Sequence, residues 1–319
     1  MNHTRRGALQ GLMGLGLAAT GCADAPVDPA AAARAAAAFV QPWRALPGAF
    51  LAPVVPALGA QARPGTGMYV KLRVPTALAL RWPELLIADL GLSRLWRADL
   101  MANTLTAIAS APVGPQTRLE IGVDHSAWVL DPPSRQVLRY SRDGTLGQTW
   151  RTRAEAPSPS SLAPLDGGLA LLVADATLGQ WAELRGGGAT ALAVRPRGVD
   201  GAPVRVDALA AQRDQIVVLD RAAAAVHRVT RDGRVLETLP APDLAQAVDI
   251  RLDRHGRVWA LDGLGRHLLV LSGGVAPRRV GADELGVQHI GGFALDERYL
   301  AVSDRLVGQV QVLTVKAPA

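Results

Sequence analysis

Residues 216–239 read IVVLDRAAAAVHRVTRDGRVLETL, in which three short apolar runs are separated by two turn signals. The branched residues before Asp220 favour a half-buried strand, because such side chains pack well on a pleated surface. Apolar and polar residues alternate over 226–229, which predicts a second strand with one buried face. The Asp-Gly pair at 232–233 is a strong hairpin signal before a third strand at 235–239. The stretch is an antiparallel meander, and a meander alone cannot bury both its faces.

The aspartate that ends the first of these runs recurs at a regular period. The six Asp-ended runs are LLIAD, AWVLD, LLVAD, VVLD, VWALD and LAVSD, which end at Asp89, Asp131, Asp175, Asp220, Asp262 and Asp304. Subtracting neighbouring positions gives spacings of 42, 44, 45, 42 and 42 residues. Apolar strands precede and follow these runs in the same phase. Six copies of a four-strand unit predict an all-β fold, a six-bladed β-propeller of four-stranded antiparallel blades, since each sheet needs neighbours on both faces.

The last copy ends before a fourth strand can form, because only residues 316–319 follow its third strand. The segment GMYVKLRV at residues 67–74 precedes the first copy and belongs to no complete unit. We therefore expect residues 67–74 to supply the missing outer strand of blade six, so that the ring closes without a large unpaired edge. The propeller is predicted to span residues 67–315, with 316–319 as a tail.

The repeat resembles the NHL family of six-bladed propellers, within the wider SMP-30/NHL-like group. The closest segment is ADLGLSRLWR at residues 88–97, which places Arg94 at the arginine of the family's D-x-x-N-x-R-apolar pattern. Two other copies keep an arginine one position earlier, at Arg135 and Arg266. The resemblance covers residues 67 to 315 and implies a fold rather than one activity, because members of this group bind proteins, RNA or small molecules and a few are enzymes.

The N-terminal stretch MNHTRRGALQGLMGLGLAATGC predicts export. A basic start is followed by an apolar run from Gly11 to Ala19, which is too short to span a bilayer and is typical of a signal peptide. Arg5 and Arg6 resemble the pair of a twin-arginine signal, and the Sec route stays open. Residues 19–22, ATGC, resemble a bacterial lipobox, so residues 1–21 would be removed and Cys22 acylated.

Cys22 is the chain's only cysteine, so a disulfide within the chain is impossible and a lone thiol at this position has a ready purpose. Ala23 follows it rather than aspartate, which by resemblance to proteobacterial sorting favours the periplasmic side of the outer membrane. The inner membrane, and an unlipidated protein in the periplasm, are the alternatives. Residues 22–66 are predicted to be a lipidated tether and a strap rich in proline and alanine. Residues 30–38 form either a short helix or part of a disordered linker.

Composition argues against a nucleic-acid surface. The chain carries 34 basic and 28 acidic residues, a formal charge of +6, without a run of five basic residues, and aromatic residues make up only 4%. A nucleic-acid surface needs clustered charge and stacking side chains. We expect no nucleic-acid partner and a monomeric ring.

The six aspartates would gather at one end of the ring. They could form a cation site, or each could cap its own turn by accepting hydrogen bonds from backbone N–H groups. Close carboxylates would repel and some would take up protons. Strict repetition is what a structural cap predicts, so the turn-cap interpretation of Asp89, Asp131, Asp175, Asp220, Asp262 and Asp304 is favoured.

No catalytic motif is evident in the sequence. His125 and His255 fall in turns between first and second strands, His227 and His267 fall on third strands, and only His289 is expected to face the central channel. Resemblance to the SMP-30 enzymes implies a divalent ion held by Glu, Asn and Asp at the channel mouth. The two asparagines, Asn2 and Asn103, lie far from that position. We expect no metal and no cofactor.

The sequence therefore predicts a non-catalytic platform that binds a protein partner in the periplasm or membrane, held to the membrane through the lipid on Cys22. The interblade loops differ from one another while the strands repeat, and a rigid ring with variable loops suits recognition. Arg153, Arg195, Arg197 and His289 are the candidates for contacting an acidic partner or ligand. The alternative is a metal-dependent small-molecule hydrolase or lactonase of the SMP-30 type.

Overall fold

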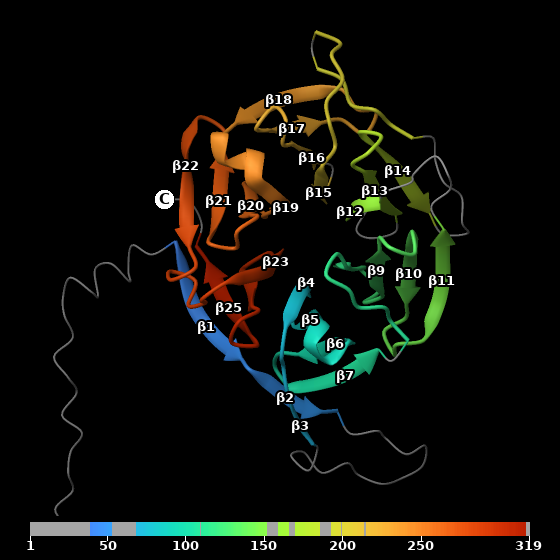
Figure 1. Cartoon of the computed structure of the whole chain (residues 1–319), viewed down its shortest axis with the longest axis vertical. Helices are drawn as coiled ribbons and strands as arrows, with labels where there is room; N and C mark the ends of the chain where they lie inside the picture. The colour runs from blue at the N-terminus through green and yellow to red at the C-terminus, as the bar shows by residue number, and fades with distance from the viewer. Residues whose placement is uncertain are drawn as a thin grey trace, which may run out of the picture. The chain divides into compact units, whose positions relative to one another are not determined.

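A computed structural model describes residues 39–52, 68–108, 110–151, 159–165, 170–185, 193–198, 200–213 and 215–316. In these residues the strands form six sheets that stand as blades around one central axis (Figure 1). The predicted all-β, six-bladed β-propeller is confirmed.

The positions within a blade are filled in chain order from the axis outward, except that the outer strand of blade six comes from the N-terminal part of the chain. The innermost strands are β4 (Pro75–Arg81), β8 (Arg118–Ile121), β12 (Pro159–Leu165), β15 (Ala208–Gln212), β19 (Ala247–Leu252) and β23 (Ile290–Asp296). The second strands are β5 (Glu84–Asp89), β9 (Ala127–Asp131), β13 (Ala170–Asp175), β16 (Gln215–Asp220), β20 (Val258–Asp262) and β24 (Tyr299–Asp304). All six predicted aspartates end a second strand.

The third strands are β6 (Arg94–Asp99), β10 (Gln136–Tyr140), β14 (Gln180–Arg185), β17 (Ala225–Val229), β21 (His267–Ser272) and β25 (Gln309–Val315). The outer strands are β7 (Thr104–Ile108), β11 (Leu146–Arg151), β18 (Val235–Pro240), β22 (Val275–Gly281) and, for blade six, β1 (Val40–Leu46). In blade three the described residues give three strands, and an antiparallel bridge from Val194 to Trp181 lies at the outer position.

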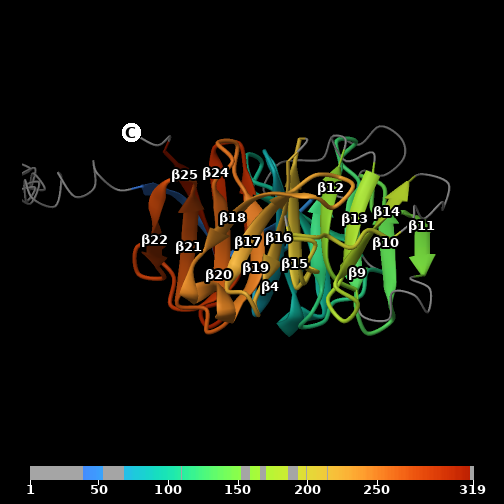
Figure 2. The ribbon, with the colours of Figure 1, turned by 90° about the horizontal axis from the view of Figure 1, so that it is seen from above.

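The strands run between two faces of the ring, which Figure 2 shows edge-on. We call the face where the six second strands end the Asp face. The opposite face carries the hairpins between first and second strands, and we call it the terminal face because both ends of the propeller lie there. Val40 pairs with Val315, and the Lys316 N–H donates to the Phe39 carbonyl at 3.1 Å.

The core consists of six apolar clusters, one at each boundary between neighbouring blades in the described residues. Between blades one and two, for example, Ala77 and Leu86 pack against Leu119 and Val129. Between blades six and one, Leu78 packs with Val310 and Val312. Each sheet is thus covered on both faces, which explains why the repeat requires a closed ring.

The ring closes with an N-terminal strand in blade six, as predicted, but the strand assigned to that role is wrong. Residues 40–46 pair with β25, while Tyr69–Lys71 (β3) pairs with Gly48–Leu51 (β2) on the outside of blade one. An outer strand pairs along one edge and buries little, so it tolerates proline and lacks alternation. The register between β1 and β25 shifts between Pro42 and Arg44. Because of this proline, the sequence pattern favours a strap rather than a strand.

The N-terminal segment joins two blades. After β1 the chain passes to β2, which pairs in parallel with β7 and extends blade one. At Gly48 the backbones come so close that a Cβ would lie 2.1 Å from the Val70 carbonyl oxygen. Only glycine fits there, and the segment therefore fastens blade six to blade one.

Helix is scarce in the described residues. Two short 3-10 helices are present, η1 (Leu90–Leu92) and η3 (Pro242–Gln246). No helix in this part of the chain is long and apolar enough to cross a membrane. Residues 1–38, with Arg5, Arg6, Cys22 and the helix considered for residues 30–38, lie outside the described residues, as do residues 53–67 of the strap.

Candidate functional site

Five of the six carboxylates at the ends of the second strands accept hydrogen bonds from backbone N–H groups of the described residues. Asp89 accepts from Leu92, Asp175 from Thr177 and Leu178, Asp220 from Ala223, Asp262 from Arg266, and Asp304 from Leu306 and Val307. At Asp131 it is the backbone carbonyl that accepts a bond, from the Ser134 hydroxyl. These bonds hold the turn that leads into each third strand.

Three of the six carboxylates also hold the link that enters the same blade. Asp89 accepts from the N–H groups of Arg73 and Val74 at 2.8 and 2.9 Å. Asp220 accepts from Arg205 at 3.0 Å, and Asp304 from Gln288 at 2.6 Å. One side chain therefore joins two chain segments. In the described residues, no group of three or more His, Cys, Asp or Glu side chains is placed to hold a metal ion.

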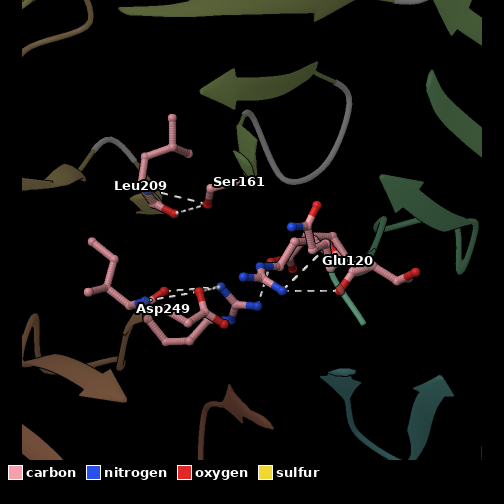
Figure 3. A network of polar contacts seen from close by, with 9 residues as sticks. Glu120, Ser161, Leu209 and Asp249 are labelled. Atoms are coloured by element: carbon pink, nitrogen blue, oxygen red, sulfur yellow. Dashed lines mark hydrogen bonds and ion pairs between the residues drawn. The ribbon is translucent and has the colours of Figure 1, made fainter. Parts of the chain in front are cut away.

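A charged pair crosses the central channel below the Asp face. Glu120 on β8 and Arg251 on β19 belong to blades two and five, on opposite sides of the ring, and the Arg251 Nη2 lies 3.8 Å from the Glu120 Oε1. The Arg251 Nη1 donates to the Asp249 Oδ1 at 2.9 Å (Figure 3). The Arg251 and Glu120 side chains are only 12% and 16% exposed. The pair ties opposite blades together and closes the channel.

The alternation of the inner strands explains how these charges reach the axis. On β8, Leu119 and Ile121 pack into the boundary with blade one, so Arg118 and Glu120 point away from it. On β19, Ile250 and Leu252 pack against blade four, leaving the positions of Asp249 and Arg251 for the channel. The sequence signal was that each of these strands carries two opposite charges at alternate positions, Arg118 and Glu120 on β8 and Asp249 and Arg251 on β19.

Burial raises the pKa of Glu120 to about 7, with Arg251 opposing the shift and Asp249 adding to it. A carboxyl with a displaced pKa in a cavity is a feature of functional sites and also of structural ion pairs. The neighbouring cavity, lined by Arg118, Asp249, Arg251 and Phe293 among others, measures about 40 Å³. That volume suits one or two water molecules and excludes a metabolite.

A larger concavity opens above this pair, at the mouth of the channel on the Asp face. We call it the mouth pocket. It measures about 460 Å³, and blades two to five contribute to its wall Gln116, Arg118, Pro132, Pro133, Pro159, Ser160, Ala176, Asp207, Leu219, Arg221, Ala247 and Val248. The pocket is asymmetric, since blades one and six add no residue to this wall.

The polar groups of the mouth pocket differ in how many hydrogen bonds and ion pairs they make within the chain. Arg221 is held by Asp207, through its backbone N–H and its Nη2, each at 2.9 Å. The Arg118 guanidinium donates only to the backbone carbonyls of Gln116 and Thr117, at 3.5 and 3.3 Å, and pairs with no carboxylate in the described residues. The Ser160 Oγ is buried without a hydrogen-bond partner there. The Arg118 guanidinium is therefore available to a ligand, and the buried Ser160 hydroxyl lies in the same wall.

Three of the four candidates for partner binding, Arg195, Arg197 and His289, lie apart from this pocket. Arg195 donates through Nε to the Gln180 Oε1 at 3.1 Å, and Arg197 donates to the Gly201 carbonyl at 3.2 Å, both on the link between blades three and four. The His289 ring packs against Gly265, where an added Cβ would lie 2.2 Å from it. Arg153 lies outside the described residues. The structure therefore brings Arg195 and Arg197 onto one loop and leaves His289 at the boundary of blades five and six.

A second buried charge cluster joins blades one and two near the terminal face. Glu84 is 4% exposed and contacts the Arg97 Nη1 at 2.7 Å, the Arg142 Nη2 at 2.9 Å and the His125 Nδ1 at 3.2 Å. Burial lowers the pKa of Arg97, and Glu84 opposes that shift. Sequence reasoning placed His125 in its turn without this partner, because Glu84 belongs to another blade.

Comparison with known proteins supports the fold. No family model matches the chain, and no curated protein matches it either. Virginiamycin B lyase from Staphylococcus aureus is similar in structure at 10% identity, with a TM-score of 0.51 over 76% of this chain and 95% of the lyase. A streptogramin B lyase reaches 0.55 at 9% identity, over 77% and 94% of the two chains.

A protein of another kind is similar to the same degree. The Pan2 WD40 domain from Neurospora crassa gives a TM-score of 0.50 at 11% identity, over 77% of this chain and 90% of the domain. At such identities the likeness concerns the propeller fold and carries no activity.

Proposed function

We propose that this chain is an exported, lipid-anchored propeller of the NHL-like type that binds a protein partner at the mouth pocket without carrying out chemistry. The observation that carries this proposal is the mouth pocket itself. It is asymmetric within a symmetric repeat, and it holds the Arg118 guanidinium and the Ser160 hydroxyl without side-chain partners. Groups of this kind suit a carboxylate or another acidic group on a protruding segment of the partner.

The closed channel supports binding rather than conversion of a small molecule. The Arg251 guanidinium contacts both Glu120 and Asp249, so the channel's acidic groups already face an internal cation. A divalent ion of the lactonase type would have to displace it. The space below the mouth pocket, about 40 Å³, is too small for a substrate.

The proposed location follows from the N-terminal sequence. Residues 1–21 would direct export, through the twin-arginine or the Sec route, and Cys22 would carry the lipid at the periplasmic side of the outer membrane. Both ends of the propeller lie on the terminal face, so the mouth pocket opens on the side away from the attachment. An anchored chain in this orientation presents the pocket to the periplasm. Incorporation of a labelled fatty acid by the wild type, lost in Cys22→Ala, is the expected result.

Affinity purification from native membranes tests the binding site. Wild type and Arg266→Glu, which changes an exposed arginine on the Asp face outside the pocket, should recover the same partner in fixed stoichiometry. Arg118→Glu should lose it, because a carboxylate in the pocket repels an acidic group. Equal recovery by Arg118→Glu, with the variant folded by circular dichroism, contradicts the proposal. A metal-dependent hydrolytic activity abolished by Glu120→Gln would favour the alternative enzyme.

A further inference from the structure

The terminal face carries a second concavity, at the other mouth of the channel. It measures about 570 Å³ and is lined by Arg81, Trp82, Gln212, Arg213, Arg254, Asp296, Glu297, Arg298 and Tyr299. Four arginines from blades one, four, five and six therefore surround one opening. We call Arg81, Arg213, Arg254 and Arg298 the arginine ring.

The arginine ring has no acidic partner in the described residues. No ion pair joins any of its four guanidinium groups to a carboxylate in this part of the chain, whereas Arg97 in blade one is paired with Glu84. Arg254 donates only to the His255 ring, at 2.9 Å. Of the two acids in the wall, Asp296 accepts from the backbone N–H groups of Trp82 and Glu297. Four guanidinium groups against two carboxylates leave the opening with an excess of positive charge for an external anion.

Aromatic side chains stand beside the arginine ring. Trp82 and Tyr299 stack at 3.9 Å between ring centroids, and Trp43 meets Trp82 edge-on at 4.9 Å. Trp43 is 38% exposed, on the outer strand of blade six. Tryptophan and tyrosine next to basic residues are typical of surfaces at the membrane–water boundary, where the ring is apolar and its N–H or O–H stays in water.

Phe39, the first described residue after the proposed anchor at Cys22, lies on this same face and is fixed by aromatic and cationic neighbours. The Phe39 ring stacks on Trp259 at 5.4 Å, and the Arg257 guanidinium carbon lies 4.4 Å from its centroid. The Arg298 carbonyl accepts from the Val315 N–H, so the exit of the chain adjoins the arginine ring. Phe39 follows Cys22 by 39 − 22 = 17 positions, a length of chain that can reach at most about 60 Å. A lipid on Cys22 would keep Phe39, and with it the terminal face, within that reach of the bilayer.

We propose that the terminal face docks on a membrane surface of anionic lipid headgroups, with the arginine ring contacting lipid phosphates and Trp43 at the interface. The proposal rests on the proposed anchor for its orientation. Guanidinium groups bind phosphate in two-point geometry, and each basic residue near an anionic surface strengthens binding about fivefold. Docking would fix the mouth pocket on the side that faces away from the membrane.

Vesicle binding tests this docking without the lipid anchor. The full chain carrying Cys22→Ala should bind phosphatidylglycerol-containing vesicles and bind pure phosphatidylcholine vesicles much more weakly, and added salt should weaken the former. In this background the fourfold variant R81Q/R213Q/R254Q/R298Q should lose about a hundredfold or more of its affinity, and each single substitution about fivefold. The control R73Q/R94Q/R266Q/R305Q removes four arginines from the Asp face and should change the affinity less than about fivefold.

Three results would overturn the proposal. Equal losses in the two fourfold variants would mean that only net charge matters. No loss in the first variant would remove the arginine ring from the contact. Tighter binding to soluble polyglutamate than to the vesicles would make the face a protein-binding surface. The single substitutions decide the question if the fourfold variant does not fold. Partner recovery depends on Arg118 and vesicle binding on the arginine ring. Failure of vesicle binding therefore leaves the proposed partner site in the mouth pocket untouched, and failure of partner recovery leaves the membrane docking untouched.

Discussion

The charged side chains on the two faces of the ring differ in their internal bonding. On the Asp face carboxylates bond to groups of the same chain: Asp89 accepts from three backbone N–H groups, and Asp207 pairs with Arg221. On the terminal face the arginine ring surrounds an opening without internal partners in the described residues. The repeated aspartates therefore bond within the fold, while the arginine ring is left to contact something outside the chain.

The largest expected effect separates two aspartates of the same repeat position. Asp89→Ala should lower the free energy of unfolding by about 3–5 kcal/mol, because three N–H groups in a buried setting lose their acceptor. Asp131→Ala should cost less than about 1 kcal/mol, since its side chain is partly exposed and accepts from no backbone N–H group of the described residues. Urea denaturation followed by circular dichroism measures both. Equal losses would show that repetition, rather than local bonding, decides what each aspartate contributes.

The cross-channel pair should give the next largest effect. Arg251→Met leaves Glu120 and Asp249 without their cation and should cost about 3 kcal/mol, while adding Glu120→Gln should recover part of that loss. The matched control is Glu237→Gln, which breaks a pair with Arg228 in which the glutamate is 41% exposed and should cost less than about 1 kcal/mol. A double-mutant cycle with no coupling between positions 120 and 251 would remove the pair from the account of ring closure.

Acidity offers a third test of the same pair. Because the pKa of Glu120 is about 7 in the folded chain and 4.5 unfolded, the folded state binds the proton more tightly. Its stability contribution is fully present below pH 4.5 and is lost as the pH rises to 7, by up to about 3 kcal/mol. The pH profile of unfolding should flatten over this window in Glu120→Gln. An unchanged slope would mean that this carboxyl does not retain its proton.

The closing segment should give a smaller effect. Gly48→Ala places a methyl group against the Val70 carbonyl and should cost about 1–3 kcal/mol. Gly147→Ala on β11 has its nearest neighbour at 3.7 Å and should cost less than about 1 kcal/mol. Thermal unfolding of the two variants compares them. If Gly147→Ala is the more destabilising, the close contact between Gly48 and Val70 is not what holds blade six to blade one.

The sequence was informative wherever a feature repeats. The period of the six aspartates predicted the number of blades, and the truncated last copy predicted closure by an N-terminal strand. Residues 40–46 were missed because β1 buries only its two end residues, Val40 and Leu46, and contains Pro42, so no alternation of apolar and polar residues marks it as a strand. Phe39 also gave no signal, since its partner Trp259 lies far along the chain.

The candidate sites were harder to predict because their members lie in different blades. Glu120 and Arg251 are 131 residues apart (251 − 120), and only the ring brings them across the axis. Each arginine of the arginine ring is an ordinary charge at the end of a hairpin when taken alone. Arg195, Arg197 and His289 were chosen for their loops, and loop variation does not say which loops border a pocket.

The account depends most on the mouth pocket being the contact surface for a partner. A photo-crosslinking amino acid at Val248, which lines the pocket and is 42% exposed, tests this in the native host. The matched position is Leu306, 65% exposed on the Asp face outside the pocket. A single discrete protein adduct from position 248, absent at position 306, is the predicted result. Adducts from position 306 alone, or identical products from both, would contradict it.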